Sequence, residues 1–154
     1  MTEKEVEFLV DWVKRHIENK DVVFKKIESS EKRDDCLYVK YKDKEATFLA
    51  VPSIKDDSVL EKLKGINNYK TLVTLNHPSN IEFVIKNWDK LVELGRELSI
   101  YFVNPFSKTE RIWIVHPYTH NFIADMDSLE LGLKTMSENV EYISEDEFKK
   151  IITS

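Results

Sequence analysis

Histidines are the side chains whose spacing most directly suggests chemistry in this chain. His116 and His120 are separated by three residues, and Asp125 and Asp127 follow them. Imidazole nitrogens and carboxylate oxygens are ligands of zinc, so His116 and His120 are candidate metal ligands. Pro117 argues against a helix that would place both imidazoles on one face. The alternative is a pair of loop histidines whose hydrogen bonds are satisfied within the protein.

His77, in the segment LNHPSN, is a second candidate. It follows an apolar run at 71–75 and precedes a helical pattern that begins near Ser79. The carboxyl ends of parallel strands are where open α/β sheets bind ligands, and the start of a helix favours an anion. An anion site at His77 and an ordinary connecting-loop histidine are the two interpretations.

Other reaction classes lack their sequence signatures. Ser53, Ser79 and Ser107 are not flanked by the glycines of a nucleophile elbow, and no glycine-rich phosphate loop is present. Cys36 is the one cysteine, which excludes an internal disulfide and a cysteine-based metal cluster within one chain. Its apolar neighbours predict a buried thiol rather than a reactive one.

Length and charge limit the classes of function. A chain of 154 residues with 42% apolar content predicts a single globular domain. The charged start MTEKEVEF and the lack of a long apolar window predict a soluble, cytoplasmic protein with no membrane partner. The net charge is −5, and it comes from the second half of the chain, so a general basic surface for nucleic acid is absent. The abundance of Lys and Glu is typical of thermophile proteins.

The expected strands are rich in β-branched and aromatic residues, and they lie at 22–27, 36–41, 46–51, 71–75, 99–103 and 111–115. Strand 46–51 is almost wholly apolar, as expected for a strand covered on both faces. A helix between it and 71–75 predicts a right-handed crossover that makes these two strands parallel. The segments 28–35 and 116–125 are expected to be loops.

The expected helices repeat apolar residues at helical spacing, and they begin near Thr2, Asp56, Ser79, Asp127 and Ser144. Three starts match the capping-box pattern, at Thr2 with Glu5, Ser79 with Glu82 and Ser144 with Glu147. The predicted fold is therefore α/β, with a mixed central sheet that joins an antiparallel hairpin to a parallel crossover and with helices on both faces. Its core is expected at about 2–103, and about 104–154 adds a strand and helices.

The order of elements from Thr2 to Leu75 is similar to the core of the PD-(D/E)xK, or restriction-endonuclease-like, nuclease family. In that family an acid opens the second strand, and an acid and a lysine one residue apart lie on the third strand. Asp35 matches the first position, at the head of CLYVKY. Ala50 and Pro52 stand where the resemblance places the other acid and the lysine, so the chain departs from the catalytic pattern.

Because Ala50 and Pro52 stand at these two positions, the sequence leaves more than one hypothesis for the function open. The family reaction needs two or more carboxylates to hold Mg²⁺ or Mn²⁺ and a lysine to steer the attacking water, which Asp35 alone does not supply. The first hypothesis is a catalytically inactive nuclease-like domain that acts as a nucleic-acid-associated or protein-interaction module, with a protein partner or a second copy of itself. Its net charge does not support nucleic acid, and no cofactor is expected.

The enzyme hypothesis is a divergent Mg²⁺- or Mn²⁺-dependent nuclease whose carboxylates have migrated to Asp35, Glu45 and either Glu5 or Glu7. The simpler interpretation of Asp35 is a turn residue before a strand, and that of Glu5 and Glu7 is helix capping or a solvent-facing position. A third hypothesis is a structural scaffold without a ligand, because the acidic second half would repel phosphates.

Overall fold

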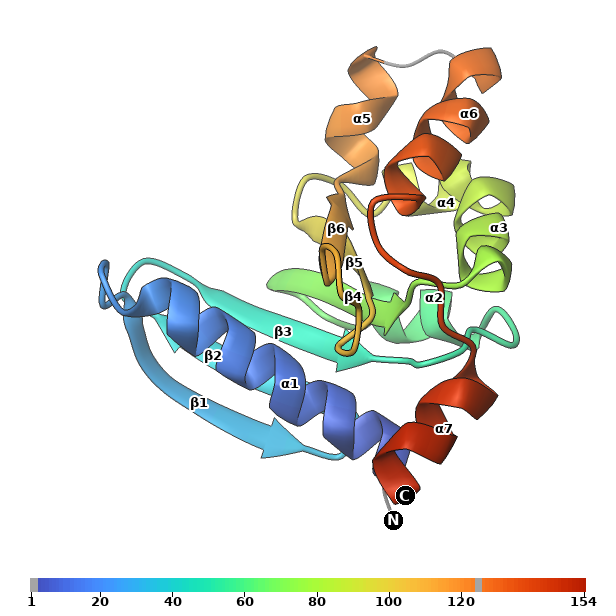
Figure 1. Ribbon diagram of the computed structural model, residues 1–154. Coiled ribbons are helices and arrows are strands. Elements are labelled where there is room, and N and C mark those ends of the chain that lie inside the picture. The colour runs from blue at the N-terminus through green and yellow to red at the C-terminus, as the bar shows by residue number, and fades with distance from the viewer. Residues whose placement is uncertain (1–2, 124–125) are drawn as a thin grey trace.

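The computed structural model describes residues 3–123 and 126–154, and within them a six-stranded sheet forms the centre of the protein (Figure 1). The strands follow the chain order across the sheet, and they are β1 (Ile27–Arg33), β2 (Cys36–Tyr41), β3 (Glu45–Ala50), β4 (Tyr69–Leu75), β5 (Leu98–Val103) and β6 (Ile112–Val115). β4 is parallel to both β3 and β5, and the remaining neighbours are antiparallel. The predicted mixed α/β sheet is confirmed.

Helices cover both faces of this sheet. They are α1 (Lys4–Asp21), α2 (Ser58–Lys64), α3 (Pro78–Lys86), α4 (Trp88–Val92), α5 (Pro117–Ile123), α6 (Met126–Ser137) and α7 (Glu145–Thr153). α1 and α7 pack on one face with Leu37 and Phe48, whereas α2, α3, α4 and α6 pack on the other face with Leu49 and Leu72. Alternation of side chains along each strand produces these two apolar clusters. Within the described ranges, no helix is long and apolar enough to cross a lipid bilayer.

The first strand lies later in the chain than predicted. α1 continues to Asp21, and the β-branched and aromatic residues 22–24 form an exposed turn instead of a strand. The Asp21 carboxylate accepts hydrogen bonds from the backbone N–H groups of Lys26 and Ile27, at 2.8 and 2.9 Å, which fixes this turn. β1 then occupies most of the segment expected to be a loop. It is an edge strand, so its polar sequence faces water without a penalty.

The predicted loop at 116–125 is also wrong in part, because α5 begins at Pro117. Proline at the first helical position removes an N–H that has no helical partner in any case, so it favours this helix start.

The helix starts give mixed results. The capping box of Ser144 with Glu147 is confirmed. α3, however, begins at Pro78 with His77 as its cap, so the box predicted at Ser79 is wrong. The predicted box at Thr2 includes a residue outside the described ranges, and α1 follows Glu3 without a side-chain cap.

Candidate functional site

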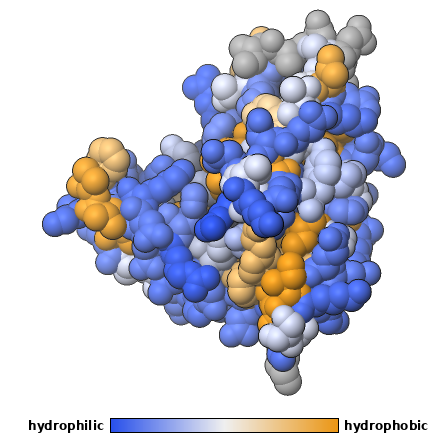
Figure 2. Space-filling view, viewed as in Figure 1, coloured by the Kyte–Doolittle hydropathy of each residue, from blue (hydrophilic) through white to orange (hydrophobic). Residues whose placement is uncertain are grey.

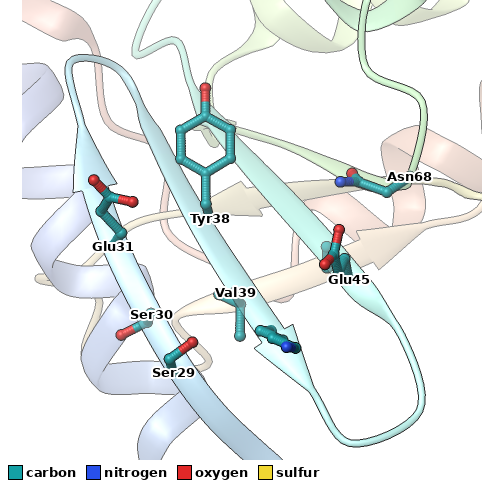
Figure 3. Close-up of a pocket in the computed structure, with 9 residues that line it drawn as sticks. Ser29, Ser30, Glu31, Tyr38, Val39, Glu45 and Asn68 are labelled. Atoms are coloured by element: carbon teal, nitrogen blue, oxygen red, sulfur yellow. The ribbon is translucent and has the colours of Figure 1, made fainter.

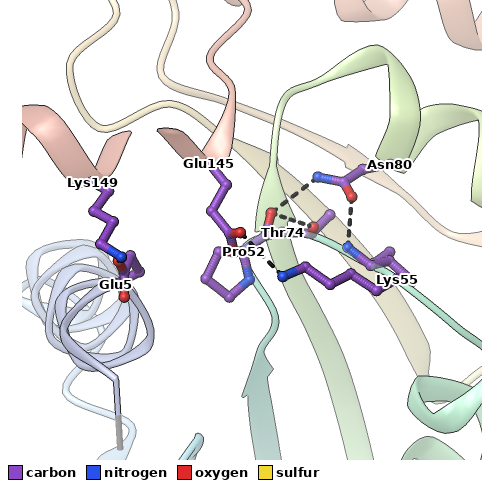
Figure 4. Close-up of polar contacts among 8 residues, drawn as sticks. Glu5, Pro52, Lys55, Thr74, Asn80, Glu145 and Lys149 are labelled. Carbon is purple, nitrogen blue, oxygen red and sulfur yellow. Dashed lines mark hydrogen bonds and ion pairs between the residues drawn. The ribbon is translucent and has the colours of Figure 1, made fainter. Parts of the chain in front are cut away.

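The carboxyl ends of β3 and β4 form the edge of the sheet to which the resemblance assigns catalysis (Figure 4). Asp35 lies beside the end of β3, because the Ala50 N–H donates to the Asp35 carbonyl oxygen at 2.8 Å. Near this edge, α1 and α7 border a groove of about 370 Å³ that is lined by acidic and basic side chains, including Glu5, Lys55 and Lys149. We call this region the catalytic edge, after the position that the resemblance would give to catalytic residues.

Lysines pair with three carboxylates in this region. Lys149 Nζ lies 3.7 Å from Glu5 Oε1, and Lys55 Nζ lies 3.4 Å from Glu145 Oε1 (Figure 4). Similarly, Lys62 Nζ of α2 lies 3.2 Å from Asp35 Oδ2. Each of these carboxylates therefore already has a cationic partner.

Asp35 also interacts with the neighbouring cysteine. The Cys36 thiol donates to Asp35 Oδ1 at 3.5 Å. Burial, and then the negative charge of Asp35, raise the pKa of the Cys36 thiol to about 11. The predicted buried position of Cys36 is confirmed.

Glu45 lies at the other end of β3 from Asp35. Glu45 opens the strand, and Ala50, which is beside Asp35, closes it, so the backbones of Asp35 and Glu45 are roughly 16 Å apart along the strand. Glu45 lines a different groove of about 360 Å³, together with Glu31 of β1 and Tyr38 of β2 (Figure 3). Asp35 and Glu45 thus do not come together around one metal ion.

Glu5 is buried, with 6% of its surface exposed, whereas Glu7 is exposed. Glu7 therefore faces solvent as expected. Glu5 does not face solvent, and the capping box expected for it includes Thr2, which lies outside the described residues. Glu5 borders the groove of the catalytic edge and is bound by Lys149.

Pro52, at the position where the resemblance places a lysine, has a structural role through its carbonyl oxygen. This oxygen accepts hydrogen bonds from Leu75 N–H at 3.2 Å, Asn80 Nδ2 at 3.1 Å and Thr74 Oγ1 at 3.3 Å (Figure 4). Asn80 also donates to the Leu75 carbonyl oxygen and accepts from the Ile54 N–H, both at 2.9 Å. The sequence did not lead us to predict this role of Asn80. A polar residue on the apolar face of a predicted helix is the feature that could have indicated it.

His77 caps α3, since its Nδ1 accepts from the Ser79 N–H at 3.2 Å. It lines a groove of about 240 Å³ together with Glu145 and Asp146. An anion in this groove would meet two carboxylates, so the position does not favour the predicted anion.

The structure places His116 and His120 one helical turn apart. The His116 N–H donates to His120 Nδ1 at 3.2 Å, and His116 Nδ1 lies 3.0 Å from Ser99 Oγ. Burial, and then the neighbouring His120, lower the pKa of His116. Asp125 and the side chain of Asp127 lie outside the described residues. Among the residues that the structure describes, no three His, Cys, Asp or Glu side chains are grouped so that they could hold a metal ion.

No known protein family, curated protein or solved structure matches this chain. Within the described residues, the structure shows a mixed α/β sheet and three lysine–carboxylate pairs near the carboxyl end of β3.

Proposed function

We propose that this chain is a catalytically inactive, nuclease-like domain that acts as a protein-interaction module. The observation that carries the proposal is the catalytic edge, where lysines occupy the carboxylates and where Ala50 and Pro52 replace reactive groups. Metal-dependent cleavage requires at least two carboxylates on one ion and a lysine that is free to position water. Asp35 is bound to Lys62 and is remote from Glu45, which favours loss of catalysis.

An exposed apolar turn supports the choice of a protein partner. Val22, Val23 and Phe24 are 66%, 82% and 71% exposed, and apolar atoms gather at this tip in Figure 2. Apolar patches of this kind on a protein surface often mark contact sites. We call residues 22–24 the apolar tip.

Lysines surround the apolar tip. Lys20, Lys26 and Lys44 line a shallow hollow with Phe24, and the Lys42 N–H donates to the Lys26 carbonyl oxygen at 2.8 Å. Asp21 and Asp43 also line this hollow, and Asp21 is engaged by backbone N–H groups. A partner that fits the tip is a protein with an apolar pocket and an acidic rim. As part of this proposal, we expect the protein to be cytoplasmic, as its sequence predicts.

Catalysis is tested with Mg²⁺ and Mn²⁺. We expect no cleavage of single- or double-stranded DNA or RNA, and no metal binding by calorimetry, for the wild type and for Asp35→Asn. Cleavage that requires the metal and disappears in Asp35→Asn would overturn the proposal and support the divergent nuclease instead.

Binding is tested by selecting a displayed library of random peptides on the immobilised protein. We expect selected peptides to combine acidic and apolar residues, and to lose affinity in Phe24→Ser. Phe122→Ser is the matched control, because Phe122 on α5 is also 71% exposed. Peptides that bind both variants equally would exclude the apolar tip as the contact surface. A nucleic acid that binds the wild type and is lost in Phe24→Ser would assign the tip to the nucleic-acid alternative and contradict the protein-partner proposal.

A further inference from the structure

A separate groove of about 610 Å³ lies between α1 and the connection from β5 to β6. Figure 1 shows this connection beside α1. The groove is larger than the one of about 370 Å³ at the catalytic edge. It differs in chemistry as well, because arginines, aromatic rings and a histidine line it. We call it the α1 groove.

Two arginines give the α1 groove a positive charge. Arg15 comes from α1 and Arg111 comes from the segment before β6, so they belong to opposite walls. Neither arginine forms an ion pair with any residue in the described part of the chain, and Glu110 is the one acid among the lining residues. A protein with a net charge of −5 thus presents two available guanidinium groups in one groove. Guanidinium groups match the oxygens of a phosphate by paired hydrogen bonds.

Aromatic rings form an apolar wall beside the arginines. Trp12 is half-buried in this wall, whereas Trp88 and Trp113 are core residues with 2% and 6% exposure. Phe106 is 37% exposed, and its ring centroid lies 5.6 Å from that of Phe8. Exposed aromatic faces are the surfaces on which nucleic acid bases stack.

His16 is the histidine among the lining residues, and it packs against the aromatic wall. The imidazole stacks on Trp12, with ring centroids 5.2 Å apart and an interplanar angle of 12°. Its Nε2 is the one buried side-chain nitrogen or oxygen atom without a hydrogen-bond partner in the described residues. Native proteins satisfy nearly all such atoms with protein groups or ordered water, so this nitrogen is a place where a water molecule can bind behind the aromatic wall. Burial, and then Lys20, lower the pKa of His16, which favours a neutral ring.

We infer that the α1 groove binds a nucleoside phosphate, with the phosphate held by Arg15 and Arg111 and the base placed against the aromatic wall. A free mononucleotide and the phosphorylated end of a single strand share this chemistry. The groove uses neither the apolar tip nor the catalytic edge, so this inference is independent of the proposed function.

The test is a titration of the purified protein with AMP, GMP, CMP, UMP and inorganic phosphate. Calorimetry measures affinity, and tryptophan fluorescence reports on Trp12, the half-buried indole. We expect saturable binding of at least one nucleotide in the micromolar to millimolar range, and binding of inorganic phosphate that is weaker by about tenfold or more. Addition of a short 5′-phosphorylated single strand identifies the source, since the tighter of the two ligands is the natural form.

Variants assign the binding to the groove. We expect Arg15→Gln and Arg111→Gln each to weaken nucleotide binding by about tenfold or more, because each removes a charged hydrogen-bonding group. Arg96→Gln is the matched control, since Arg96 lies over Tyr118 and does not line the groove. Arg15 and Arg111 are exposed, so their variants should unfold at the wild-type temperature. Absence of nucleotide binding, equal affinity for inorganic phosphate, or equal effects of all three arginine variants would overturn the inference.

Discussion

Asn80 is the residue whose replacement tests most directly how the end of β3 is held. It is 1% exposed and makes three hydrogen bonds, to the Pro52 carbonyl, the Leu75 carbonyl and the Ile54 N–H. Asn80→Ala removes all three. We expect this variant to fold with a substantially lower free energy of unfolding.

The partners that remain set the magnitude of this effect. The Pro52 oxygen keeps its donors from Thr74 and Leu75, and the Leu75 oxygen keeps the His77 N–H at 2.9 Å. The Ile54 N–H loses its side-chain acceptor, and Ile54 is 9% exposed. An unsatisfied buried N–H costs about 1–3 kcal/mol, and each of the other two hydrogen bonds contributes about 0.5–1.5 kcal/mol. The expected loss is therefore about 2–6 kcal/mol.

Urea unfolding of the wild type and of Asn80→Ala measures this loss. Asn80→Asp keeps the acceptor for Ile54 but points a carboxylate at two carbonyl oxygens, so it should be at least as destabilising as Asn80→Ala. Lys86→Ala is the control, because Lys86 is an exposed residue of the same helix and its replacement should change the free energy of unfolding by no more than about 0.5 kcal/mol. A loss below about 1 kcal/mol for Asn80→Ala would refute the role given to these hydrogen bonds.

Three further predictions concern other parts of the chain. Ser144→Ala should lower the free energy of unfolding by about 1 kcal/mol, because it removes the cap of α7, and urea unfolding checks this. Cys36 should react slowly with a thiol reagent at pH 8 until urea unfolds the protein, because the buried thiol has a pKa of about 11 instead of the ordinary 9.0. The protonated thiol should contribute fully to stability below pH 9, and this contribution should decline as the pH rises from 9 to 11. His116 should titrate below 6.5 in an NMR experiment, so its contribution is present above that pH and is lost as pH falls through the folded pKa. Normal reactivity of Cys36 or an unshifted His116 would contradict the burial assigned to each.

Sequence patterns identified the strands that are covered on both faces. β3 and β4 contribute residues to the apolar clusters on both faces of the sheet, so their mainly apolar composition was enough to predict them as strands. The prediction missed β1 because an edge strand can be polar. It placed a strand at the apolar tip because residues 22–24 are β-branched or aromatic, types that are common in strands, although here they form an exposed turn. α5 was missed because the effect of Pro117 depends on whether it starts a helix or interrupts one.

The candidate sites were less predictable, because they depend on which segments meet. The position of Asp35 at the end of β3 follows from hairpin pairing, and so does its separation from Glu45. The pairing of Glu5 with Lys149 joins the two ends of the described chain, and no local pattern indicates it. Likewise, the α1 groove combines Arg15 with Arg111 through packing of α1 beside the loop before β6.

Packing at the end of β3 disfavours an acidic side chain at position 50. Ala50 is 2% exposed and belongs to the apolar cluster between the sheet and α1. A glutamate at this position would bury a carboxylate in that cluster, which costs several kcal/mol without a partner. The nearby lysines Lys62 and Lys149 already bind Asp35 and Glu5. Introducing an acid at position 50 would therefore destabilise the sheet, which supports the inactive state that we propose.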